Sequence, residues 1–263
     1  MSDVPAEGAA APRLRMDPRI RERRVAVRRD EGRRRLRLVL AAAGVVAAVA
    51  LAYGVTRTPL LDVDEVRVVG AVRTTTDDVR LAGGLADRPQ LADVEPSEVA
   101  VLVERLPWVQ EAEVVRHWPG TVEVALVERT AVAALPAAAG GWAVVDTSGR
   151  VLAIEPAAPE GMVQVAAPPA PGPGEQVALA VRSSLVVLDA LPPSLSARVN
   201  GITLAADGTL DLHAMGLPII RFGPPDQVRP KLVALATLAA RTDLRGVDAI
   251  DVRVPTAPVL TGR

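Results

Sequence analysis

The chain contains no cysteine among its 263 residues. This absence excludes a disulfide framework, a thiol nucleophile and thiolate metal ligands. The fold must therefore be stabilised by a hydrophobic core. Roughly 200 residues follow position 57, which is enough for one or two domains.

Aromatic side chains are also scarce: the chain has only Tyr53, Trp108, Trp118, Trp142 and Phe222. Where aromatics are so rare, each is expected to fill a core or corner position that a smaller side chain cannot. We therefore expect the three tryptophans to pack in cores, with ligand stacking as the alternative interpretation.

Lysine is nearly absent, since Lys231 is the only one and all other basic residues are arginine. Twelve arginines and four acidic residues lie between Arg13 and Arg37, a net charge of +8. Residues 38–263 carry a net charge of −7. An acidic main part argues against nucleic-acid binding, whereas the basic segment could contact anionic membrane lipid.

The residues that most often carry catalysis or bind metal are few. The two histidines, His117 and His213, are both expected at strand ends, and neither has a neighbouring nucleophile in the sequence. The Gly140-Gly141 pair lacks the lysine and hydroxyl residue of a phosphate-binding loop. Four glutamates are expected on a solvent-exposed strand face and not as a catalytic carboxylate pair: Glu111, Glu113, Glu123 and Glu128. The histidines, the glycine pair and these glutamates together predict that the protein is not an enzyme and has no cofactor or metal site.

One long uncharged run is present, from Leu38 to Val55. As a helix it would be about 27 Å long, enough to cross the hydrocarbon core of a bilayer. Arginines at the amino-terminal side keep that side in the cytoplasm. We expect a disordered tail at 1–36, a transmembrane helix at 37–56 and a single-pass protein of the inner membrane whose carboxy terminus lies outside; Arg33, Arg34, Arg35 and Arg37 set this topology.

Three other interpretations of the run remain open. Ala50-Leu51-Ala52 fits the cleavage pattern of a signal peptide, but the lead is long for one. A buried helix of a soluble protein would have to tolerate the adjacent arginines. The Arg23-Arg24 and Arg28-Arg29 doublets fit a twin-arginine export signal only weakly.

Residues 60–130 predict a small α+β domain. Val63–Val69 predicts a strand that ends at Gly70, and Thr75 with Asp78 predicts a capped helix. Pro96 begins a second helix whose apolar face includes Leu106, and Pro107 stops it. Two strands follow, 109–118 and 121–129, joined by a type II turn at Pro119-Gly120. The order β-α-α-β-β indicates a three-stranded sheet covered on one face by two helices.

Residues 131–260 predict a second, β-rich domain. The pattern of Trp142–Leu152 predicts a hairpin around an Asp/Ser/Gly turn, and residues 156–174 predict a proline-rich loop. A helix is expected at 175–190, followed by strands at 199–204, 209–213 and 218–222. A second helix at 228–241 and a strand at Ile250–Val254 complete this part.

Several weak motifs in the right order resemble the POTRA domain of the FtsQ/DivIB family of bacterial cell-division proteins. The motifs of the first domain include Val66-Arg-Val-Val-Gly70, Leu106-Pro-Trp-Val109 and Arg116-His-Trp-Pro-Gly-Thr-Val122, and Trp142-Ala-Val-Val-Asp146 resembles the opening of the family's β-rich domain. The POTRA core and turn residues are Val66, Val68, Gly70, Leu106, Trp108, Trp118, Pro119 and Gly120.

The resemblance implies a bitopic division scaffold enriched at the septum. Its implied partners are FtsB-like and FtsL-like membrane proteins and, through them, septal peptidoglycan synthases. The family's last strands receive an added partner strand, which here places the docking edge in Ile250–Leu260, with a short ladder because Pro255 and Pro258 lack N–H donors. The candidate docking residues are Ile250, Asp251, Val252, Arg253, Val254, Thr256 and Ala257.

Two further function classes stay open at this point. An outer-membrane assembly or secretion component would also carry POTRA domains, but it would need a following barrel of many strands. A membrane-tethered cell-wall enzyme would need an acid–base pair that the sequence does not offer.

Overall fold

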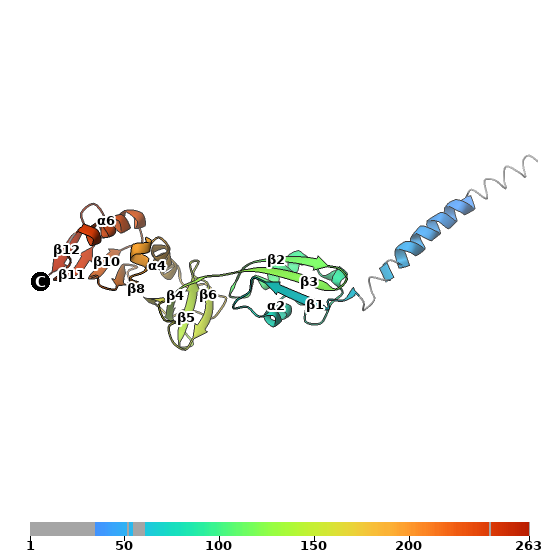
Figure 1. Ribbon diagram of the computed structural model, residues 1–263, viewed down its shortest axis with the longest axis horizontal. Coiled ribbons are helices and arrows are strands. Elements are labelled where there is room, and N and C mark those ends of the chain that lie inside the picture. Colours follow the sequence, from blue (N-terminus) through green and yellow to red (C-terminus); the bar gives the residue numbers. More distant parts are fainter. Residues whose placement is uncertain (1–34, 52, 55–60, 242, 263) are drawn as a thin grey trace, which may run out of the picture. The chain divides into compact units, whose positions relative to one another are not determined.

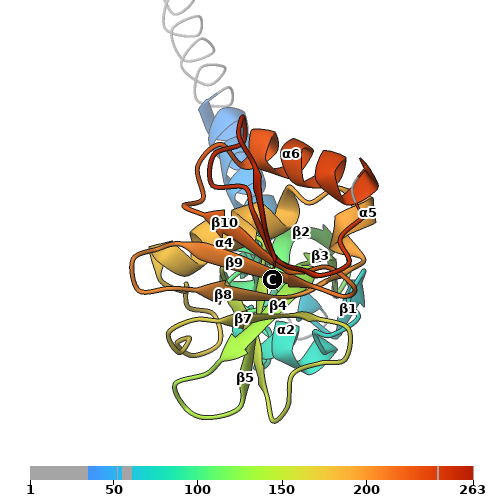
Figure 2. The same ribbon diagram turned by 90° about the vertical axis from the view of Figure 1, so that its left-hand side faces the viewer.

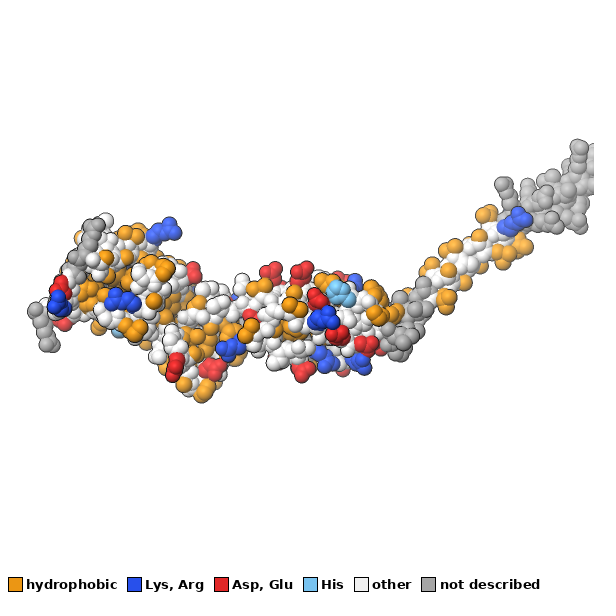
Figure 3. All heavy atoms as spheres, in the orientation of Figure 1, with side chains coloured by type: hydrophobic (Ala, Val, Ile, Leu, Met, Phe, Trp, Pro, Cys, Tyr) orange, Lys and Arg blue, Asp and Glu red, His pale blue; other side chains and the backbone are white. Residues whose placement is uncertain are grey.

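The computed structural model describes residues 35–51, 53–54, 61–241 and 243–262. The chain divides into two units, Met1–Thr58 and Pro59–Arg263. In the first unit, residues 35–51 form a helix whose side chains are all exposed (Figure 1). Hydrophobic side chains surround this helix, with arginine at its amino-terminal end (Figure 3).

The predicted transmembrane segment 37–56 is described only in part, because residues 52, 55 and 56 lie outside the described residues. Within the described ranges, no helix reaches the length and apolarity needed to cross a bilayer. The tail at 1–36 also lies almost wholly outside them, Arg33 and Arg34 included.

The second unit begins with a three-stranded sheet of order β1-β3-β2. Strand β1 (Glu65–Val69) runs parallel to β3 (Thr121–Glu128), and β2 (Val109–His117) is antiparallel to β3. Helices α2 (Thr76–Ala82) and α3 (Pro96–Val103) pack on this sheet, with the short helix η2 (Leu91–Asp93) between them in the chain (Figure 1). This arrangement confirms the predicted β-α-α-β-β domain.

The local signals in this domain hold with two exceptions. Thr75 and Asp78 form the predicted capping box. Helix α3, however, ends at Val103, four residues before Pro107, so proline is not what stops it. Gly120 does not have the positive φ that a type II turn requires, and the Trp118-Pro119 bond is cis. Glycine is needed there because a Cβ would lie 2.6 Å from the Asp62 carbonyl oxygen.

The remaining strands form one nine-stranded sheet of order β12-β11-β10-β9-β8-β7-β4-β5-β6. Strands β4 (Ala131–Pro136), β5 (Trp142–Asp146) and β6 (Val151–Glu155) form an antiparallel meander at one end. Strand β7 (Val163–Ala166) lies between β4 and β8 and is parallel to both. Strands β8 (Val199–Leu204), β9 (Leu210–Ala214) and β10 (Ile219–Gly223) form a second meander, followed by β11 (Val247–Asp251) and β12 (Val259–Gly262).

Helices α4 (Leu179–Asp189), α5 (Pro193–Ser196) and α6 (Val228–Arg241) complete this part. Val181 and Leu185 of α4 share one core with Leu232 and Leu235 of α6 and with inward side chains of every strand from β4 to β11. Figure 2 shows α6 over the region of β9 and β10. Alternate strand residues point to the other face, where Gln164, Thr203 and Arg221 are exposed.

The sequence missed three strands in this sheet. Strand β4 covers Ala131–Pro136, where no strand was predicted. Strand β7 falls in the stretch 156–174, which we expected to be loop because prolines flank it on both sides. Strand β12 falls beyond Pro258, where no alternating pattern is long enough to predict a strand. The last predicted strand, Ile250–Val254, is displaced: β11 covers Val247–Asp251 instead.

Candidate functional site: the carboxy-terminal sheet edge

The last strand of the sheet, β12, lies at the end of the strand order and pairs with β11 on its inner side. On its outer side no strand of the described chain pairs with it. Val259 is 56 % exposed at the start of β12, and Thr261 and Gly262 are exposed as well. An edge of this kind presents backbone donors and acceptors to which another strand can add.

Most of the docking residues predicted from the sequence lie behind this edge. Ile250 is fully buried and pairs with Ile220 on one side and with Leu260 on the other. Asp251 pairs with Val259, and the Val252 amide donates to the Arg221 carbonyl oxygen at 3.0 Å. Their backbone groups therefore do not form the free ladder that we expected, because β12 already covers that side of β11.

The segment between β11 and β12 forms the reversal that brings β12 back along β11. Val254, Thr256 and Ala257 lie in this reversal rather than in a strand, and the Ala257 amide donates to the Val254 carbonyl oxygen at 3.0 Å. Pro255 and Pro258 suit a reversal because each has a fixed φ and no donor to leave unpaired. Thr256 and Ala257 therefore do not form a strand ladder in this structure, and their contact with a partner stays a prediction.

Arg253 lies beside Asp251 and is held by it. The Arg253 Nε donates to both carboxylate oxygens of Asp251, at 3.0 and 2.9 Å, and its Nη2 donates at 2.6 Å. These hydrogen bonds lower the pKa of Asp251 below its ordinary value. Although it is paired, the Arg253 side chain remains 58 % exposed, so the pairing orients the guanidinium at the surface and does not bury it.

A shallow groove of about 550 Å³ lies near the β11–β12 reversal. It is formed by the first half of α6 and by the reversal itself. Two valines add apolar surface in these elements, since Val233 is 60 % exposed and Val254 is 57 % exposed. The groove is lined by Gln227, Arg229, Pro230, Val233, Ala234, Pro255 and Thr256.

Lys231 fixes the turn that precedes α6. Its side chain is 1 % exposed, and its Nζ donates to the Pro224 carbonyl oxygen at 2.7 Å and to Asp226 Oδ1 at 2.6 Å. The ammonium also lies 5.1 Å from the centre of the Phe222 ring, a distance typical of cation–π attraction. The only lysine of the chain thus orders the turn before α6, the helix whose first half forms one wall of the groove. Sequence reasoning noted this residue without assigning it a role.

The two sheets are joined through a buried ion pair. Arg129 follows β3, and its Nη1 donates to Asp146 Oδ2, at the end of β5, over 2.8 Å. The Arg129 Nε also donates to the Val109 carbonyl oxygen at 3.0 Å. Arg150, whose amide donates to Asp146 Oδ1, extends its Nη2 to the Arg105 carbonyl oxygen at 2.7 Å. Nothing in the spacing of Arg129 and Asp146 identified this pair.

The POTRA residues predicted from the sequence take different places. Val66, Val68 and Leu106 are partly buried and pack against the core of the first sheet. Gly70 has a φ of 83° and lies so close to β3 that a Cβ would be 2.3 Å from the Leu126 carbonyl oxygen. Trp108 is half-buried beneath the guanidinium of Arg73.

The expectation that all three tryptophans pack in cores is not met, since Trp108 and Trp142 are only half-buried and Trp118 is exposed. Trp118 is 57 % exposed in the hairpin loop that joins β2 to β3. Glu128 also differs, since it is not a solvent-facing carboxylate: it accepts hydrogen bonds from the Arg73 and Thr74 amides at 2.7 to 3.0 Å. Glu128 thereby holds the loop that precedes α2.

Comparison with known proteins shows that both halves of the second unit match described protein families. Residues 61–129 match the family described as POTRA domain, FtsQ-type, and residues 133–253 match Cell division protein FtsQ/DivIB, C-terminal.

Named relatives agree with these matches. The cell division protein FtsQ of Streptomyces bingchenggensis is 30 % identical over 88 % of this chain and 90 % of its own length. That of Streptomyces collinus is 30 % identical over 89 % of this chain and 91 % of its own length. That of Mycolicibacterium smegmatis is 30 % identical over 76 % of this chain, but the match spans only 59 % of its length. The chain therefore belongs to the FtsQ/DivIB family of cell division proteins.

Proposed function

We propose that this protein is a membrane-anchored scaffold of the bacterial division machinery and performs no chemistry of its own. It consists of a cytoplasmic tail (1–36), a transmembrane helix (37–56), a POTRA domain (60–130) and a β-rich domain (131–260). The two folded domains lie outside the cytoplasmic membrane and gather partner proteins at the septum. Relatives that match about nine-tenths of this chain are named cell division protein FtsQ, which supports this role.

The anchor is supported by the charge pattern around the apolar run. Leu38–Val55 has no charged side chain, whereas Arg35 and Arg37 precede it directly. A helix with apolar side chains on all sides has no polar face to present to water, so a bilayer is the environment that suits it. Arginines before the helix favour a cytoplasmic amino terminus. Intact mass of the membrane-bound protein tests this, since a chain starting at Tyr53 would show that the run is a cleaved signal.

We propose the outer edge of β12 as the docking site for a strand of an FtsB-like partner, which itself associates with an FtsL-like protein. The observation that carries this proposal is that β12 closes the strand order with its outer side unpaired in the described chain. Alternate residues of a short added strand can gain main-chain hydrogen bonds there. Ile250, Asp251 and Val252 then support β12 from behind.

The surroundings of β12 supply side-chain contacts to such a partner. The groove beside the reversal offers apolar surface for a side chain at one end of the added strand. Arg253, exposed and oriented by Asp251, offers a donor for an acidic residue of the partner. Main-chain pairing would give affinity, and these two features would give specificity.

A matched set of valine-to-aspartate variants tests the docking edge. Val259→Asp and Val233→Asp place a charge on the β12 edge and in the groove, and both valines are more than half exposed. We expect both changes to weaken recruitment of the FtsB-like partner. Val72→Asp makes the same change at a valine of the POTRA part that is 86 % exposed, and it should leave recruitment unchanged. Equal recruitment by all three variants would exclude this edge.

A further inference from the structure

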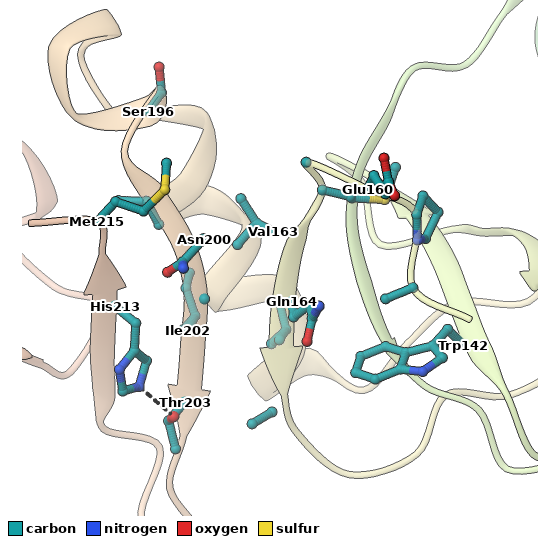
Figure 4. A pocket seen from close by; sticks show the side chains of 18 of the residues that line it. Trp142, Glu160, Val163, Gln164, Ser196, Asn200, Ile202, Thr203, His213 and Met215 are labelled. Atoms are coloured by element: carbon teal, nitrogen blue, oxygen red, sulfur yellow. Dashed lines mark hydrogen bonds between the residues drawn. The ribbon is translucent and has the colours of Figure 1, made fainter.

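The open face of the nine-stranded sheet contains a hollow of about 830 Å³, away from β12. It lies over β7, β8 and β9 and is bounded by the start of β5 and by the loop 158–162. Figure 4 shows Trp142 on one side of this hollow, His213 and Thr203 on the other, and Gln164 between them. Its size is within the range of natural ligand clefts.

The floor of the hollow includes Gly201, a strand residue without a side chain. Gly201 of β8 pairs with Gln164 of β7 on one side and with His213 of β9 on the other. Glycine in the middle of a strand is unfavourable and commonly marks a bulge or a place where another molecule approaches. A register shift between Val199 and Gly201 does put a bulge here.

The backbone does not require glycine at position 201. Its φ lies outside the left-handed region, unlike that of eleven other glycines. A Cβ built there would meet its nearest neighbours at 3.5 to 3.7 Å, which is ordinary van der Waals contact. A Cβ would therefore fit, and its absence leaves open space above the sheet.

The polar groups around the hollow are nearly all uncharged. Gln164 and Asn200 present exposed amides, and Thr203 Oγ1 lies 2.9 Å from His213 Nε2. Glu160, at the rim, is the one acidic side chain of the lining, and no lysine or arginine takes part. The adjacent rows of the same face differ, since Asp211, Arg221 and Asp251 pair across β9, β10 and β11.

This combination selects against ions and favours a neutral polar ligand. A charged ligand would meet no opposite charge apart from Glu160, and would lose hydration without compensation. A sugar ring offers hydroxyl groups to the amides and weakly positive C–H groups to the negative face of the Trp142 indole. An N-acetyl group adds to these hydroxyls an amide that can both donate to and accept from Gln164 and Asn200.

We propose that this hollow binds an uncharged oligosaccharide of N-acetylated hexosamine units. The inference rests on the proposed function only in placing residues after the anchor outside the cytoplasm, where such glycans occur. It does not depend on the β12 edge. Docking of a neutral peptide in the same hollow is the competing outcome.

The test measures binding of chitotetraose to the full-length protein in detergent or nanodiscs, by saturation-transfer NMR and tryptophan fluorescence. We expect saturable binding by the unaltered protein. Gly201→Val fills the hollow, and Gln164→Ala removes one amide, so each should weaken binding about tenfold. Ala125→Val likewise places a valine, adding two methyl groups, at an exposed strand position of the POTRA sheet, and it should bind like the unaltered protein.

Thermal unfolding separates an effect on binding from an effect on folding. Gly201→Val should melt no lower than the unaltered protein, since valine favours strands and a Cβ at position 201 makes only ordinary van der Waals contacts. Absence of saturable sugar binding, equal binding by Gly201→Val, or binding only of an uncharged acetylated octapeptide would overturn the proposal. Any of these results would leave septal recruitment through β12 unaffected, so the two proposals fail separately.

Discussion

Arg129 and Asp146 form a short ion pair at 2.8 Å that joins the end of the first sheet to the second, with side chains only 19 % and 6 % exposed. Arg129 also holds the Val109 carbonyl oxygen of β2, so one guanidinium contacts both domains. Because its groups are largely removed from water, losing one partner leaves the other uncompensated. The pair is therefore a sensitive point of the molecule.

Replacement of one partner should destabilise the protein strongly. We expect Asp146→Asn to lower the free energy of unfolding by about 3 kcal/mol, since Arg129 would stay buried without its counter-charge. Urea unfolding followed by circular dichroism measures this. Asp243→Asn is the control, because Asp243 and Arg245 form an exposed pair that should contribute about 0–1 kcal/mol. A similar loss in both variants would contradict the assigned role.

Lowering the pH should destabilise the folded protein, in part because it protonates the Asp146 carboxylate. Burial alone would raise the pKa of Asp146, but hydrogen bonds from Ser148, Arg129 and the Arg150 amide outweigh it and lower the pKa. For Glu128, burial is likewise outweighed by hydrogen bonds from the Thr74 and Arg73 amides, which lower its pKa.

Because these pKa values are lower in the folded state, the unfolded chain binds more protons than the folded chain as the pH falls. The stabilisation from Asp146 and Glu128 is thus complete above the ordinary carboxyl pKa of about 4, and is lost as the pH falls through the folded values. Melting temperatures between neutral pH and pH 3 should show this decline. Asp146→Asn should show a shallower one, and an unchanged slope would count against the assignment.

The two tryptophans of the POTRA domain should respond differently to truncation. Trp108 is half-buried beneath Arg73, so Trp108→Ala should cost about 3 kcal/mol of unfolding free energy. Trp118 is 57 % exposed, and Trp118→Ala should cost less than about 0.5 kcal/mol. Thermal unfolding of both variants distinguishes them. Equal melting temperatures would show that Trp108 does not belong to the core.

Lys231 offers a direct probe of folding because it is the only lysine in the chain. At 1 % exposure, with its ammonium bonded to Pro224 and Asp226, it should resist acetylation while the protein is folded. Mass spectrometry after brief acetic anhydride treatment should find Lys231 unmodified in native buffer and modified in urea. Rapid modification in native buffer would show that the turn before α6 opens freely.

Local patterns in the sequence were enough to predict most of the helices and strands. The capping box of α2, the hairpin of β5 and β6, and helix α6 each depend on residues close together in the chain. The turn type at Pro119-Gly120 was predicted wrongly. Glycine is required at position 120 because the Asp62 carbonyl oxygen, 58 residues away in the chain, leaves no space for a Cβ.

The candidate site was harder to predict because it depends on pairing between distant segments. The predicted strand Ile250–Val254 overlaps β11 only at Ile250 and Asp251, and β12 covers the side of β11 that was expected to be free. Its four residues, Val259 to Gly262, are too few for a periodic signal. Likewise, only the folded sheet shows that Gly201 lies between Gln164 and His213.

The most direct test of the scaffold role is where the full-length protein goes in dividing cells. A fluorescent fusion at the amino terminus, expressed in place of the native copy, should form a band at midcell as constriction begins. The same fusion carrying Val259→Asp should reach the membrane but fail to bring the FtsB-like partner to that band. An even distribution of the unaltered fusion around the cell envelope, with division proceeding normally, would contradict the account.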